Sequence, residues 1–175
     1  KPGHSSELSS QAIMGTPIKI LKKIDDWCHI ETPDGYQGYI IGNSLVSKSY
    51  DDMKLWRDSE RVVVSSIYQT YIYKSPKKTG VRDIITDVVN GVILNGVKSS
   101  DEYSRVELPD GTIGYILSRD IIPIREWAEQ SFNSELILDM AYSMHGLPYL
   151  WGGTSTKSLD ASGLPKVCYY AKGII

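Results

Sequence analysis

Residues 31–40 read ETPDGYQGYI, and residues 107–116 read ELPDGTIGYI. Both stretches contain a PDG turn and end in GYI, and the second begins 107 − 31 = 76 residues after the first. The same offset continues on both sides without a gap and pairs residues of like chemistry: Ile13 with Val89, Gly15 with Gly91, Trp27 with Tyr103, and Leu45 with Ile121. A repeat with its glycines and aromatic residues in register predicts two copies of one structural unit.

Each copy has the pattern of short β-strands joined by turns. TPIKIL at 16–21 and VILNGV at 92–97 carry apolar residues at strand spacing, and PDG supplies the turn between two later strands. A unit of about 40–60 residues can just enclose one small all-β core. The pattern resembles bacterial SH3-type (SH3b) barrels, in which a Gly-aromatic-hydrophobic strand closes the barrel. We expect Trp27, Tyr39 and Tyr115 to serve this core and its closure.

The rest of the chain has helical patterns. Between the copies, SKSYDDMKLWRDSE at 47–60 places Met53 and Trp56 three apart, which predicts a short helical connector. A second helix should begin at Ser134 as its N-cap and stop at Gly146. A third should have Asp160 as its N-cap candidate and end at Gly173.

Composition excludes several classes of function. The chain is 41% hydrophobic and 23% charged, as in ordinary globular proteins, and its formal charge of −2 offers no basic field for nucleic acid. No apolar run approaches the ~18–20 residues that a transmembrane segment needs. Cys28 and Cys168 form neither a metal-binding pattern nor a disulfide framework, and we expect each to be a small buried apolar side chain rather than a reactive thiol. No cofactor or metal is expected.

The stretch PYLWGGTSTKSLDASGL, residues 148–164, contains the candidate catalytic site. A cysteine at a helix N-terminus has a lowered pKa, and the free N–H groups there can hold an oxyanion. The geometry around 160–163 therefore suits a cysteine hydrolase whose sulfur would stand at position 161, yet the residue there is Ala161. The stretch resembles the NlpC/P60 cysteine-peptidase motif, in which Asp-Cys-Ser-Gly opens the catalytic helix.

Two SH3b-like units followed by this motif resemble the γ-D-glutamyl-L-diamino acid endopeptidases, also called dipeptidyl-peptidase VI. The resemblance implies a mainly β fold with α: two small SH3-like barrels followed by the helical N-terminal part of a papain-like α+β NlpC/P60 domain. The implied parts are a first SH3b barrel at 1–47, a helical connector at 48–61, a second SH3b barrel at 62–123 and a partial NlpC/P60 domain at 124–175.

The resemblance also implies a substrate site. Ala161 stands in the nucleophile position, flanked by Asp160 and Ser162, which match residues lining the substrate site. Family members grip the free amine of a murein peptide with a carboxylate and a tyrosine of the first SH3b unit, and the matching residues are Glu7 in ELSSQ and Tyr36 in GYQG. Tyr149 and Trp151 would wall the cleft. Two structural alternatives remain open: Glu7 as a solvated strand-edge residue and Trp151 as a core residue.

Three functions remain open at this point. The family cuts after L-Ala-γ-D-Glu in murein peptides with a free N-terminal L-Ala. This chain is expected to be an inactive, truncated member, because Ala161 cannot attack and none of its three histidines fits the catalytic role: His4, His29 and His145. It could instead be a pseudoenzyme that binds muropeptides or cell wall. The third alternative is a scaffold whose residues 134–175 dock a partner protein, because the apolar face at Leu164, Val167 and Cys168 lacks a cover. The substrate class implies the cell envelope, periplasmic or secreted, with the cytoplasm as the alternative during murein recycling.

Overall fold

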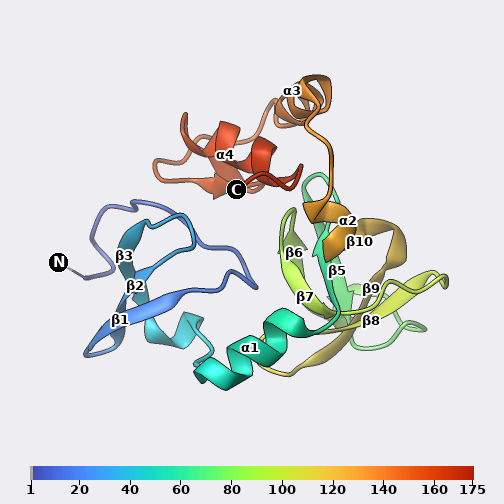
Figure 1. Ribbon diagram of the computed structural model, residues 1–175, viewed down its shortest axis with the longest axis horizontal. Coiled ribbons are helices and arrows are strands. Elements are labelled where there is room, and N and C mark those ends of the chain that lie inside the picture. The colour runs from blue at the N-terminus through green and yellow to red at the C-terminus, as the bar shows by residue number, and fades with distance from the viewer. Residues whose placement is uncertain (1) are drawn as a thin grey trace.

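The computed structural model describes residues 2–175, which form a mainly β structure with four α-helices. Figure 1 shows three parts: a first sheet in blue, a second sheet in green and yellow beside it, and a helical segment in orange and red that lies over both. Helix α1 runs between the two sheets at the side opposite the helical segment. The functional residues predicted above come from the first and third parts.

The first sheet is antiparallel with the order β1-β2-β3. Its strands are β1 Lys19–Ile24, β2 Trp27–Glu31 and β3 Gln37–Ile41, followed by the 3₁₀ turn η1 Gly42–Ser44. Side chains alternate along β2, so that Cys28 and Ile30 are buried and their neighbours are partly exposed. This alternation is what a strand with one covered face requires.

The second sheet has the strand order β10-β4-β7-β8-β9-β5-β6. Its elements are β4 Arg61–Val64, β5 Gln69–Tyr73, η2 Val81–Asp83, β6 Ile84–Val89, β7 Ile93–Gly96, β8 Tyr103–Glu107, β9 Ile113–Leu117, η3 Ser118–Asp120 and β10 Ile121–Pro123. Its core contains fully buried aliphatic side chains, among them Val62, Ile72, Leu94, Ile116 and Ile121. The two sheets form where two barrels were predicted, and closure of each sheet into a barrel stays a prediction.

The predicted repeat reappears in the structure as matching elements. The bounds of β8, β9 and η3 are those of β2, β3 and η1 moved by the repeat offset. The PDG turns also match, because Thr32 donates its N–H to the carbonyl of Tyr36 and Leu108 donates to the carbonyl of Thr112. In each turn the glycine has a left-handed backbone, with φ of 78° at Gly35 and 87° at Gly111. The internal repeat is confirmed.

Helix α1, Tyr50–Asp58, confirms the predicted connector. Its start is a capping box, in which the Ser49 hydroxyl accepts from the N–H of Asp52 and the Asp52 carboxylate accepts from the N–H of Ser49. The two reciprocal bonds satisfy backbone donors that would otherwise be unpaired, so this short helix has a defined beginning.

The helical segment contains α2 Ile124–Ala128, α3 Ser134–Ser143, the two short strands β11 Thr154–Ser155 and β12 Ser158–Leu159, and α4 Gly163–Tyr170. The expectation that Ser134 is the N-cap of α3 is wrong. The side chain of Asn133 accepts from the N–H groups of Glu135 and Leu136, and Ser134 is the first helical residue. Asparagine is as good an N-cap as serine, and the N-cap therefore lies one residue before the predicted one.

Helices α3 and α4 cover each other. Their shared core contains Ile137, Met140 and Met144 from the region of α3 and Val167 and Cys168 from α4, with Leu164 packed at its margin. The apolar face of α4 therefore has an intramolecular cover, and the expectation that it needs a partner protein is wrong. Both cysteines are buried and free, as predicted.

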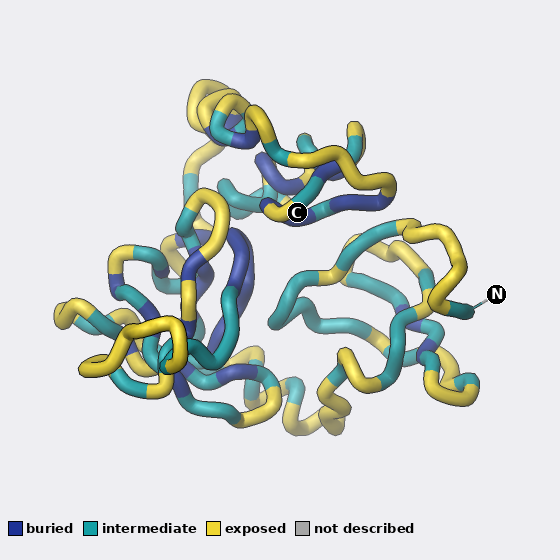
Figure 2. Tube along the Cα trace, turned by 180° about the vertical axis from the view of Figure 1, so that it is seen from behind, coloured by how far each residue is buried: buried dark blue, intermediate teal, exposed yellow. Residues whose placement is uncertain are grey.

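Figure 2 shows buried residues concentrated in the second sheet and the helical segment, whereas the first sheet is mostly partly buried or exposed. The expectation that Tyr39 serves the core is wrong, because its side chain is 44% exposed and stacks on His29 with 4.9 Å between ring centroids. Its counterpart Tyr115 pairs with Tyr73 of β5, whereas β3 is an edge strand of its sheet. Among residues 2–175, no helix combines the length and apolar character that crossing a bilayer requires.

Candidate functional site

The start of helix α4 is organised by the carboxylate of Asp160. Oδ1 accepts from the N–H groups of Ser162 at 2.9 Å and Gly163 at 2.6 Å and from the Ser162 hydroxyl at 2.8 Å, while Oδ2 accepts from the N–H of Gly152 at 2.9 Å. These donors, the Gly163 N–H foremost, hold the pKa of the Asp160 carboxyl below its usual value. Asp160 thus caps a helix that begins three residues later and ties the preceding loop to it.

Glycines make this close approach possible. A Cβ on Gly163 would lie 1.9 Å from the carbonyl oxygen of Gly153, and one on Gly153 would lie 2.8 Å from the carbonyl oxygen of Leu150. Gly152 has a φ of +75°, and a Cβ there would lie 2.8 Å from the carbonyl oxygen of Leu8. The glycines of WGG and DASG therefore let three backbone segments meet where any side chain would collide.

Ala161 lies between these fixed points and is exposed, as is Ser162. Among residues 2–175, no acceptor takes the N–H of Ala161, whereas the N–H groups of Ser162 and Gly163 are already bound by Asp160. Of the N–H groups at the start of the helix, those of Ser162 and Gly163 are therefore occupied, and the open donor is the one at position 161. A side chain at this position would face solvent beside a free backbone donor.

A segment from the N-terminus, residues 7–11, crosses to the same loop. Gln11 forms three hydrogen bonds with Thr154: the Gln11 N–H donates to Oγ1, Oγ1 donates to the Gln11 carbonyl, and the Gln11 side chain accepts from the Thr154 N–H. The Leu8 carbonyl lies against Gly152. Glu7, which is exposed, is thereby held one residue away from this contact.

Tyr36 joins the first sheet to the same segment. It ends the PDG turn, is 44% exposed, and its hydroxyl donates to the carbonyl of Ser9 at 3.5 Å. Because Ser9 lies within residues 7–11, the phenol group is placed beside the segment that carries Glu7. The structure therefore brings the surroundings of four predicted site residues together, from both ends of the chain: Glu7, Tyr36, Asp160 and Ser162.

The two predicted cleft-wall residues are both on the surface. Tyr149 is 68% exposed and Trp151 is 60% exposed, so the alternative of a core role for Trp151 is wrong. Trp151 directly precedes Gly152, the residue that contacts both Leu8 and Asp160. Exposed aromatic faces beside this junction are available to a ligand.

A salt bridge between the first sheet and α4 adds a contact that sequence reasoning missed. Lys166 Nζ lies 2.7 Å from Asp34 Oδ2, and Thr32 donates its hydroxyl to the same carboxylate. The Lys166 hydrogen bond, with help from Thr32, lowers the pKa of Asp34 to about 2. Asp34 was assigned only to turn chemistry, and no local pattern pairs it with a lysine on a distant helix. Gln11 lies in the quoted ELSSQ stretch, but nothing in that stretch points to Thr154.

This salt bridge gives a pH prediction. The pKa of Asp34 is lowered on folding, so the pair stabilises the structure above the unfolded pKa near 3.8 and loses its effect as the pH falls through about 2. Both side chains are more than a third exposed, so we expect a contribution below about 1 kcal/mol. In Lys166→Gln the pKa of Asp34 should rise towards its ordinary value in an NMR titration, whereas Lys172→Gln should leave it near 2. An unchanged Asp34 titration in Lys166→Gln would contradict the salt bridge.

The three histidines contact residues other than those at the start of α4. The ring of His4 packs against Trp27 of β2 at 5.2 Å, His29 of β2 stacks on Tyr39 of β3, and His145 follows the end of α3. Within residues 2–175, none of the three forms a hydrogen bond with Asp160 or Ser162. Cys168 is buried, and burial raises the pKa of its thiol, so it is not an activated nucleophile.

Known proteins resemble this chain in sequence. The model of the SH3 domain of bacterial dipeptidyl-peptidase matches residues 1–45. Dipeptidyl-peptidase 6 of Lysinibacillus sphaericus is 28% identical over an alignment that covers 100% of this chain and 66% of that protein. The γ-D-glutamyl-L-lysine dipeptidyl-peptidase of Bacillus cereus is 23% identical, with 98% of this chain and 52% of that protein covered. The chain thus spans about half to two thirds of the length of these relatives.

Solved structures resemble the chain in fold. An NlpC/P60 family protein from Bacillus cereus superposes with a TM-score of 0.76 at 23% identity, covering 94% of this chain and 55% of that one. An NlpC/P60 endopeptidase from Photobacterium damselae gives a TM-score of 0.58 at 18% identity, covering 95% of this chain and 35% of that one. The chain is thus similar in sequence to dipeptidyl-peptidases along nearly its whole length, and its fold resembles that of solved NlpC/P60 proteins.

Proposed function

We propose that this chain is the recognition part of a murein peptide hydrolase of the dipeptidyl-peptidase VI type. Its ligand is a peptide that begins with a free L-Ala followed by γ-D-Glu and a diamino acid. The observation that carries the proposal is the convergence of residues 7–11, Tyr36 and the Asp160 loop at the start of α4. The relatives named above, a dipeptidyl-peptidase 6 and a γ-D-glutamyl-L-lysine dipeptidyl-peptidase, support the same substrate class.

The groups at this junction suit an ammonium ion. Glu7 is an exposed carboxylate, and Tyr36 offers a phenolic oxygen. Asp160 keeps a lowered pKa, and its Oδ2 accepts from one N–H, which leaves acceptor capacity on that oxygen. A free α-amine carries three donors and a positive charge, so carboxylates and a phenol together favour it over an acylated amine.

Because position 161 is an alanine, the site can bind a peptide but lacks the nucleophile needed to cut it. A methyl group cannot attack a peptide carbonyl, and loss of the nucleophile in comparable catalytic triads lowers the rate by about 10⁴–10⁶-fold. The proposal for the chain as it stands is therefore binding without cutting. The place of action follows the substrate: the cell envelope, or the cytoplasm where murein peptides are recycled.

Calorimetry with L-Ala-γ-D-Glu-L-Lys tests the recognition. We expect saturable binding, weakened about 10-fold by Tyr36→Ala because the phenol and its ring are removed from the site. Thr112→Ala is the matched control, since Thr112 is the counterpart of Tyr36 in the second repeat, and it should bind as the unchanged chain does.

The N-acetylated form of the same peptide provides the chemical control. Acetylation removes the positive charge while keeping the backbone, so we expect affinity to fall by about 10-fold or more. Equal binding of the free and acetylated peptides would overturn the proposed amine site. Absence of binding at millimolar peptide would overturn the recognition function itself.

A further inference from the structure

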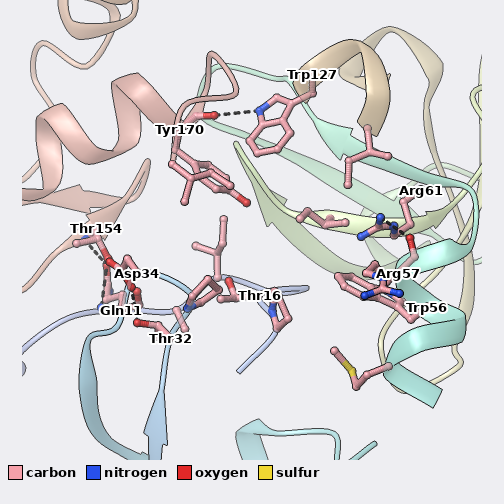
Figure 3. Close-up of a pocket in the computed structure, with 18 of the residues that line it drawn as sticks. Gln11, Thr16, Thr32, Asp34, Trp56, Arg57, Arg61, Trp127, Thr154 and Tyr170 are labelled. Atoms are coloured by element: carbon pink, nitrogen blue, oxygen red, sulfur yellow. Dashed lines mark hydrogen bonds between the residues drawn. The ribbon is translucent and has the colours of Figure 1, made fainter. Parts of the chain in front are cut away.

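A separate cavity of about 500 Å³ lies where all parts of the chain meet. Figure 3 shows Thr32 and Asp34 of the turn between β2 and β3 on one side, Trp56 and Arg57 of α1 on the other, and Trp127 and Tyr170 of the helical segment facing them. Ala161 and Ser162 do not line it. Ligand sites commonly occur at such junctions, in cavities of about 300–1,000 Å³.

One wall of the cavity is aromatic and rigid. The ring of Trp127 is 5% exposed and packs against the ring of Tyr170 at 5.0 Å, and its indole N–H donates to the Tyr170 carbonyl at 2.9 Å. Figure 3 shows the Tyr170 hydroxyl directed into the cavity, and this hydroxyl has no hydrogen-bond partner among residues 2–175. The pair therefore offers a fixed apolar surface with one unused polar group.

Positively charged side chains predominate in the lining of the cavity, although the formal net charge of the protein is −2. The charged lining residues are four cations and one carboxylate, namely Lys54, Arg57, Arg61, Lys166 and Asp34. Asp34 is paired with Lys166, and Arg57 is paired with Asp58. Within residues 2–175, Lys54 and Arg61 have no carboxylate partner.

Arg61 has more donors than the protein satisfies. Its guanidinium lies 4.5 Å from the centre of the Trp56 ring, and Nη2 donates to the Arg57 carbonyl. Its Nε is buried and has no acceptor among residues 2–175. Such a donor is costly to leave unpaired, and carboxylates are the natural partners of a guanidinium fork.

We infer that this cavity binds a small amphipathic carboxylate, with its charged group at Arg61 and Lys54 and its apolar body against Trp127 and Tyr170. Gln11 and Thr154 border both sites, but Lys54, Arg61, Trp127 and Tyr170 are not part of the murein peptide site, so the inference does not depend on it.

NMR titration with 1-naphthoate and with 1-naphthamide tests this site on the chain as it is. The two probes have the same shape, but only the naphthoate is charged, so we expect the naphthoate to bind about 10-fold more tightly. The indole N–H signals of Trp56 and Trp127 should move, while those of Trp27 and Trp151 stay in place. Equal affinities, shifts confined to Trp151, or no saturation up to about 10 mM probe would overturn the inference.

Charge variants locate the anion. Lys54→Gln and Arg61→Gln should each weaken naphthoate binding about 5-fold and leave naphthamide binding unchanged, because only the charged group is affected. Lys98→Gln, which changes an exposed lysine outside the cavity, is the control and should have no effect. Lys54 is exposed on α1, so its variant tests the site even if Arg61→Gln perturbs folding. Unchanged naphthoate affinity in Lys54→Gln would contradict the placement of the carboxylate.

Discussion

Gly163→Ala is expected to destabilise the helical segment by about 3 kcal/mol or more, because the new Cβ would stand 1.9 Å from the carbonyl oxygen of Gly153. The Gly153 carbonyl accepts from the N–H of Asp160, and the N–H of Gly163 donates to the Asp160 carboxylate, so neither residue can move alone. Relief of the collision requires the start of α4 to separate from the loop before it. Amide hydrogen exchange in α4 should therefore accelerate strongly, and the melting temperature should fall.

Gly38→Ala is the matched control for this prediction. Gly38 lies in β3 with no atom within 4 Å of an added Cβ, so the substitution should change stability by less than about 0.5 kcal/mol. Because the chain has several parts, unfolding need not be two-state, and exchange at α4 amides reports the affected region directly. Unchanged protection in Gly163→Ala would show that the loop and helix are not in close contact.

Gly163→Ala should also weaken the binding of the murein peptide. Asp160 holds Ser162, Gly163 and Gly152 together, so displacement of the helix start moves the carboxylate that we assign to amine recognition. Tyr36 and residues 7–11 would remain in place. Loss of peptide binding with an intact first sheet would therefore connect the fold of this loop to the function of the site.

Local chemistry explains what the sequence could predict. The PDG turns, the connector helix and the cap at Asp160 depend on residues a few positions apart, and each forms close to where it was expected. Tyr39 was placed wrongly because its strand was expected to close a barrel, whereas β3 is an edge strand and a partner like β5 exists only in the second sheet.

Contacts between distant segments lay beyond this reasoning. Lys166 with Asp34, Gln11 with Thr154 and the central cavity all depend on how the three parts pack, and periodicity carries no information about that packing. The cover of α4 by α3 was missed for the same reason. Both helices are amphipathic, and the sequence shows two apolar faces without showing that they face each other.

Ala161→Cys is expected to create the only readily reactive thiol among those of the described chain. Cys28 is 6% exposed and Cys168 is 1% exposed, whereas position 161 is exposed at the start of a helix. Reaction with an aromatic disulfide reagent should therefore be at least about 100-fold faster than in the unchanged chain, since access and thiolate formation both favour the new site. Ser100→Cys, an isosteric change in an exposed loop, separates exposure from the effect of the helix start.

Reactivity alone should not restore cleavage. A cysteine nucleophile needs a base that takes its proton and returns it to the leaving amine, and His4, His29 and His145 lie in other surroundings. We therefore expect Ala161→Cys to bind L-Ala-γ-D-Glu-L-Lys with unchanged affinity and to release no dipeptide above background. Dipeptide release by this variant would mean that one of these imidazoles, or another base, reaches position 161. A thiol as slow as the buried pair would instead mean that the position is closed, and the site at α4 would then lack the access that peptide binding requires.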